Sequence, residues 1–168
     1  MLSQSGTFAL VPQVVDAVGV PVVAAGGVAD GRSIAAAFAL GAAGVQIGTA
    51  YLRCPEAATP SPYRDALRES SADATLVTNV FTGRPARALQ DRLALELGPL
   101  STTALDFPLP MTALTSLRAA AERNGNGAFT PFWAGQASAL GRDTPAAALT
   151  LTLIEEAKRR FAQLARTD

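Results

Sequence analysis

The sequence contains no histidine among its 168 residues. Histidine is the commonest general base near neutral pH, a member of the usual catalytic triads and a frequent zinc ligand. Its absence therefore excludes the ordinary forms of all three sites. A single cysteine, Cys54, also excludes an internal disulfide and a metal cage built from thiolates. We expect no metal site, and we assign no catalytic residue from the sequence.

Excess charge and long apolar runs are also missing. The 14 basic and 14 acidic residues cancel, so no electrostatic footprint for nucleic acid or an anionic membrane is visible. The most apolar run, around residues 18–28, is broken by glycine and proline and is too short to span a bilayer. The first residues lack the pattern of a secretory signal. We expect a cytoplasmic protein that binds neither nucleic acid nor membrane.

The length and the hydrophobic content of 49% suit one domain of ordinary size. A whole (β/α)₈ barrel usually needs about 250 residues, so this chain is too short to form one alone.

Residues 22–49 carry the clearest structural pattern. An apolar segment typical of a strand buried on both faces leads into a glycine pair, and a helix then begins at Asp30. The expected order is helix, strand, helix and strand, over residues 8–18, 22–25, 32–40 and 44–47. Such alternation predicts parallel strands in an α/β fold.

Glycines follow both predicted strands. Gly26 and Gly27 lack a Cβ and let a ligand approach the backbone, and Gly48 and Thr49 bring further amides to the end of the next strand. The helix that begins at Asp30 directs its N-terminal amides to the same region, where an anion is favoured. These features predict an anion site, although glycine pairs also serve simply as tight turns.

Two longer motifs carry a family resemblance. Residues 24–32 read Ala-Ala-Gly-Gly-Val-Ala-Asp-Gly-Arg, and residues 40–49 read Leu-Gly-Ala-Ala-Gly-Val-Gln-Ile-Gly-Thr. Together they resemble the nitronate monooxygenase family, formerly called 2-nitropropane dioxygenases, whose members are FMN-dependent barrels. The resemblance implies that the FMN phosphate is bound by Gly26, Gly27, Gln46, Ile47, Gly48 and Thr49.

The resemblance also implies a division of the chain. Residues 1–54 correspond to a barrel segment, residues 55–130 to a small inserted α+β lobe, and residues 131–168 to a return segment with the final barrel helix. A proline-rich stretch after residue 52 marks the first boundary. The fold class expected is thus the C-terminal part of an FMN-binding (β/α)₈ TIM-type barrel with an inserted lobe.

Two further features, one in the lobe and one in the return segment, allow a ligand contact or a structural role. Residues 82–87, Thr-Gly-Arg-Pro-Ala-Arg, resemble a family segment whose Arg84 and Arg87 either steer an anionic ligand or make structural hydrogen bonds. Trp133 either covers a ligand edge or packs in the core.

Two helices are expected from local rules. The spacing of Leu89, Leu93 and Leu97 predicts one helix, and Thr144 is expected to cap the last one.

The resemblance covers only the later part of the family's chain, without the first six strands and the segment that holds the active-site histidine. It implies FMN-dependent oxidation of alkyl nitronates by O₂ to carbonyl compounds and nitrite, so the expected partners are a small nitronate and O₂. Two strands cannot close a barrel, which predicts self-association through open edges. Two alternatives stay open: a flavin barrel of the enoyl reductase type using NAD(P)H, and a non-catalytic remnant or interaction module.

Overall fold

A computed structural model describes residues 5–166 of the chain. It divides the protein into two compact units. The first unit comprises Met1–Ala58 with Leu140–Asp168, and the second comprises Thr59–Ala139. The first unit is therefore built from both ends of the chain. The three-segment division expected from the sequence stays a prediction.

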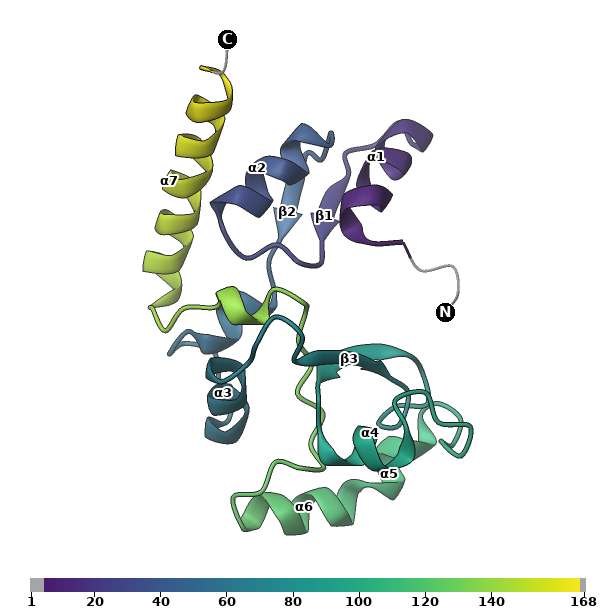
Figure 1. The fold of residues 1–168 in the computed structure, drawn as a ribbon. Helices are drawn as coiled ribbons and strands as arrows, with labels where there is room; N and C mark the ends of the chain where they lie inside the picture. The colour runs from purple at the N-terminus through teal and green to yellow at the C-terminus, as the bar shows by residue number, and fades with distance from the viewer. Residues whose placement is uncertain (1–4, 167–168) are drawn as a thin grey trace. The chain divides into compact units, whose positions relative to one another are not determined.

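In the described residues, the first unit contains two α-helices, two strands and a short 3₁₀ helix from the N-terminal segment, and one long C-terminal helix (Figure 1). These are α1 (Thr7–Ala17), β1 (Val23–Ala25), α2 (Gly31–Ala39), β2 (Gly44–Gln46), η1 (Thr49–Arg53) and α7 (Ala146–Leu164). The second unit holds α3 (Ser61–Arg68), β3 (Thr75–Thr78), β4 (Ala86–Leu89), α4 (Arg92–Leu97), α5 (Leu109–Ala113) and α6 (Thr115–Arg123). The 3₁₀ helix η2 (Ser138–Leu140) spans the point in the sequence where the units meet. Across residues 5–166, no helix combines the length and apolar character required to cross a membrane.

Strands β1 and β2 pair in parallel, which confirms the βαβ unit predicted from the sequence. Their register places Val23 opposite Gly44 and Ala25 opposite Gln46, the last residue of each strand. Parallel strands run in the same direction, so the chain leaves both strands at the same edge of this two-stranded sheet, the one formed by their carboxyl ends. The glycine-containing segments after the two strands are consequently neighbours.

The core of the first unit is made mostly of small side chains. Val11 of α1, Ala24 of β1, Ala37 of α2 and Ala42 are buried together, and larger residues pack around them. Helix α7 lies along α2 (Figure 1), with the ring of Phe161 edge-on to that of Phe38 at 5.9 Å. Small core residues allow these elements to approach closely, as the alanine-rich sequence of α2 predicts.

The second unit is an antiparallel hairpin packed with short helices. Its core contains Val80, Phe81, Leu93 and Ala94, all buried. Strands β3 and β4 pair over four residues, and Ala88 also bridges to Trp133.

The helix expected to include Leu89 begins later than predicted. Leu89 is the last residue of β4, where it lies opposite Thr75 and its N–H donates to the carbonyl of Phe132. The Asp91 side chain accepts from the N–H of Ala94 at 3.0 Å and starts α4 at Arg92. Leu93 and Leu97 lie in α4 as the leucine spacing predicts, whereas strand pairing and a local cap place Leu89 outside the helix.

Candidate functional site

The turn after β1 requires glycine at two successive positions. Gly26 has a φ of 100° and Gly27 a φ of 77°, a region that side-chain-bearing residues rarely adopt. A Cβ built on Gly27 would meet no atom within 4 Å, so the requirement comes from backbone conformation and not from crowding. Both glycines are exposed, which leaves their backbone accessible to a ligand.

The segment after β2 lies at the same edge of the sheet. Gln46 ends β2, Ile47 and Gly48 follow, and Thr49 begins η1. A Cβ on Gly48 would also meet no atom within 4 Å. Because Ala25 and Gln46 are register partners, this segment and the Gly26–Gly27 turn lie next to each other. The six residues expected from the sequence to form one site are thus brought to one sheet edge.

Thr7 also borders this edge, although it is not among the residues expected from the sequence. Its Oγ1 donates to the carbonyl of Ala25 at 3.3 Å and lies 3.0 Å from where a Cβ on Gly26 would stand. Thr7 is the first residue of α1, so the start of this helix lies beside the turn. No sequence signal distinguishes it, because its position depends on how α1 packs against β1.

Side chains of the protein cap the N-terminus of α2, where the sequence predicts a favourable position for an anion. Asp30 and Ser33 form a reciprocal capping box, in which Asp30 Oδ1 accepts from the Ser33 N–H at 2.9 Å and Ser33 Oγ from the Asp30 N–H at 3.1 Å. The Ala29 N–H also donates to Ser33 Oγ, and the Gly31 N–H donates to Glu156 Oε2 at 3.1 Å. Side chains of the protein therefore already accept from the amides of Ala29, Asp30, Gly31 and Ser33.

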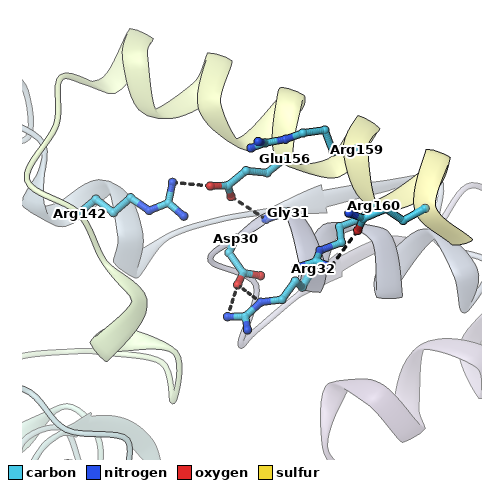
Figure 2. A pocket seen from close by; sticks show the side chains of 8 residues that line it. Asp30, Gly31, Arg32, Arg142, Glu156, Arg159 and Arg160 are labelled. Carbon is cyan, nitrogen blue, oxygen red and sulfur yellow. Dashed lines mark hydrogen bonds and ion pairs between the residues drawn. The ribbon is translucent and has the colours of Figure 1, made fainter.

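A charged pocket of about 330 Å³ adjoins this helix start (Figure 2). It is lined by Asp30, Gly31, Arg32, Arg142, Glu156, Arg159, Arg160 and Gln163. Two ion pairs form within it, Arg142 Nη1 to Glu156 Oε1 at 2.8 Å and Arg32 Nη2 to Asp30 Oδ2 at 2.5 Å. The two acidic groups are thus neutralised by neighbouring guanidinium groups.

Both carboxyl groups have a lowered pKa. For Glu156, the hydrogen bond from Arg142 lowers the pKa most; burial opposes it, and the Gly31 N–H lowers it further. For Asp30, burial alone would raise the pKa, but hydrogen bonds from Ser33 and Arg32 together outweigh it. Both groups are consequently ionised at neutral pH and suited to the positive end of the helix dipole.

The arginines of residues 82–87 make structural contacts. The guanidinium of Arg84 stacks over the ring of Phe107, 4.2 Å from its centroid, and Arg87 Nη1 donates to Thr75 Oγ1 at 3.1 Å. These contacts favour the structural interpretation of both residues over ligand steering.

Trp133 likewise packs within the second unit. It lies against the buried core with its ring edge-on to Phe81, at a centroid distance of 6.0 Å. Its carbonyl accepts a hydrogen bond from the Tyr63 hydroxyl, whose burial raises the pKa of Tyr63 to about 12. The core-packing interpretation of Trp133 is the one these contacts favour.

Comparisons with family models and with curated relatives both identify one family. The family model described as nitronate monooxygenase matches residues 2–156. A curated nitronate monooxygenase of Pseudomonas aeruginosa is 44% identical over 152 residues, which are 90% of this chain and 43% of the relative.

Two solved structures are also similar. A nitroalkane oxidase from Streptomyces ansochromogenes superposes with a TM-score of 0.85 at 40% identity, over 94% of this chain and 45% of that one. FabK from Thermotoga maritima gives a TM-score of 0.75 at 30% identity, over 97% of this chain and 52% of that one. The chain spans less than half the length of the curated relative.

Proposed function

This chain belongs to the nitronate monooxygenase family, and from that membership we propose that it is the C-terminal part of an FMN-dependent nitronate monooxygenase. The observation that supports this most directly is the parallel register of β1 and β2. It places the Gly26–Gly27 turn and the Gly48–Thr49 segment side by side, as a phosphate site at the carboxyl ends of two neighbouring barrel strands requires.

The residues at this edge fit an FMN phosphate. Gly26 and Gly27 hold positive φ values, and the space beside Gly27 and Gly48 is open, so a phosphate can approach the backbone amides. The proposed binding residues are Gly26, Gly27, Gln46, Ile47, Gly48 and Thr49. In this proposal the α2 amides of Gly31 and Ser33 take no part, because Glu156 and Asp30 already accept from them.

The chemistry assigned to the cofactor is the oxidation of an alkyl nitronate by O₂ to a carbonyl compound and nitrite. In this proposal the chain binds the phosphate end of the cofactor and thereby fixes the position of the cofactor. It has no histidine to remove a proton from a neutral nitroalkane. We therefore assign proton removal to a part of the enzyme beyond this chain, since a positioned general base contributes about 10²–10⁴ in rate.

The proposed architecture follows from the sheet. Strands β1 and β2 pair only with each other among residues 5–166, so each has an outer edge without a strand neighbour. In a (β/α)₈ barrel these edges pair with the remaining strands. The substrate site would then form only when the remaining strands are present.

The test is reconstitution with preformed nitronate, which needs no proton removed. Purified chain with FMN, nitronate and O₂ is assayed for nitrite, before and after adding the N-terminal half of a full-length relative. We expect FMN binding by the chain, no sustained nitrite release from the chain alone, and release after the addition. Robust nitrite production by the chain alone would contradict the proposal that the site is completed elsewhere.

The same assay separates the two alternatives. Oxidation of NAD(P)H with an unsaturated thioester, without nitrite, would favour the enoyl reductase type. Failure to bind FMN either alone or with the added half would favour a non-catalytic interaction module.

A further inference from the structure

We propose that Glu156 is a positioning residue for the phosphate site, although it lies on α7 and is not among the residues proposed to bind FMN. Its carboxylate holds the start of α2 and thereby fixes the turn formed by residues 26–30. The consequence for cofactor binding rests on the proposed function, whereas the effect on the turn does not.

Each oxygen of the Glu156 carboxylate has its own partner. Oε2 accepts from the backbone N–H of Gly31 at 3.1 Å, and Oε1 is 2.8 Å from Nη1 of Arg142 (Figure 2). The side chain is only 22% exposed. Because both oxygens are engaged, the carboxylate is oriented toward the helix start rather than free to rotate. Charge-assisted hydrogen bonds of this kind are stronger than neutral ones.

Backbone contact between α2 and α7 adds a second constraint. A Cβ on Gly31 would stand 2.3 Å from Glu156 Cβ and 2.6 Å from the backbone nitrogen of Ala157. Glycine is therefore required at this position by the closeness of the two helices. The first residue of α2 cannot shift toward α7, and the hydrogen bond to Glu156 opposes a shift away from it.

Only Val28, Ala29 and Asp30 separate Gly27 from Gly31, and all three are buried. The amides of Ala29 and Asp30 both donate to Ser33 Oγ, at 3.0 and 3.1 Å. Such a short and buried connection, with two of its three amides hydrogen-bonded to Ser33, has little freedom to absorb a movement of the helix start. Displacement of Gly31 is consequently transmitted to Gly26 and Gly27, the two exposed glycines with positive φ at the proposed phosphate site.

The test compares three Glu156 variants with a matched neighbour. In E156A both hydrogen bonds are lost; in E156Q the amide oxygen can still accept from Gly31; in E156D the carboxylate is withdrawn by one methylene from both partners. Glu155 is the control, because it is the adjacent α7 residue, 64% exposed, and pairs only with Lys158 among the interactions of the described chain. All variants are compared below their unfolding transitions, verified by circular dichroism.

Two readouts are measured: hydrogen exchange of the amides in residues 27–31, and the Kd for FMN by fluorescence quenching. For E156A and E156D we expect exchange to accelerate by about tenfold or more, and FMN affinity to fall by about tenfold. E156Q should recover most of both, and E155A should match the parent. If E156A fails to fold, E156D supplies the comparison.

Exchange and affinity in E156A and E156D that match E155A would overturn the inference. Slower folding or a lower Tm without a change in either readout would also overturn it, because that pattern indicates general stabilisation only. A parent chain that binds no FMN even with the added N-terminal half would refute the proposed cofactor, while the exchange rates would still decide whether Glu156 fixes the turn.

Discussion

The carboxylate of Glu56 accepts the backbone N–H of Ala146, the first residue of α7, with each oxygen 3.0 Å from the nitrogen. This cap replaces the one expected from the sequence, in which Thr144 starts the last helix. The Thr144 hydroxyl is buried and lacks a hydrogen-bond partner, and the N-cap position is held by Pro145. Helices α2 and α7 of the first unit thus both have a distant glutamate at their first amide.

Glu56→Ala should destabilise the protein by about 1 kcal/mol, the usual value of a helix N-cap. Thr144→Val should change the free energy of unfolding by less than about 0.5 kcal/mol, because it removes a hydroxyl with no partner. Urea unfolding of both variants checks this, with Glu155→Ala as the surface control. If Thr144→Val lowers the free energy of unfolding more than Glu56→Ala does, Thr144 and not Glu56 caps the helix.

Acid should weaken the contribution of Glu156. Its pKa is lower in the folded state, chiefly through Arg142, so in the acid range the unfolded chain takes up a proton first. The stabilisation is therefore complete above the ordinary glutamate pKa of about 4.3 and is lost as the pH falls through the lowered folded value. Urea unfolding from neutral to acid pH should show parent and Glu156→Gln converging on acidification. A gap that widens in acid would contradict this sign.

Gly27→Val should disturb both the turn and the proposed phosphate site. A branched side chain at φ 77° costs about 1–3 kcal/mol of backbone strain and places methyl groups in the open space beside the glycine. We expect an FMN affinity at least about tenfold weaker, measured by fluorescence quenching. Gly19→Val is the matched control, since Gly19 is exposed, has open space and has no positive φ. Equal FMN affinity in the two variants would show that the phosphate does not bind at Gly27.

The isolated chain should self-associate through the first unit. Val23 of β1 and Phe8 of α1 are 58% and 73% exposed, and strand β1 has an outer edge without a strand neighbour in the described chain. Such edges pair with other chains. Sedimentation velocity should show concentration-dependent association that Val23→Glu reduces.

The control for this experiment is Leu95→Glu, which alters a comparably exposed apolar residue on α4 of the second unit. It should leave the association unchanged. A chain that stays monomeric at high concentration, or one whose association Leu95→Glu alone reduces, would locate the contact elsewhere.

The sequence by itself determined the βαβ unit and the positions of its two glycine segments. An apolar strand of three or four residues, a helix start at Asp30 and a glycine pair are local patterns, and each element formed within one or two residues of its expected bounds. The parallel pairing followed as well, because a strand, helix and strand with short links favours it. Gly26, Gly27, Gly48 and Thr49 follow from the same local pattern, whereas Gln46 and Ile47 were expected only from the family resemblance.

Only the tertiary structure decided which groups satisfy the helix starts. Glu156 lies 125 residues from Gly31, and Glu56 lies 90 residues from Ala146, so no local pattern links either pair. The same holds for Leu89, whose leucine spacing fits a helix but whose N–H is taken by Phe132. Strand and helix propensities act over a few residues. The partner of an N–H or a carboxylate, by contrast, depends on which distant segments packing brings within 3 Å, and that decision lies with the folded chain as a whole.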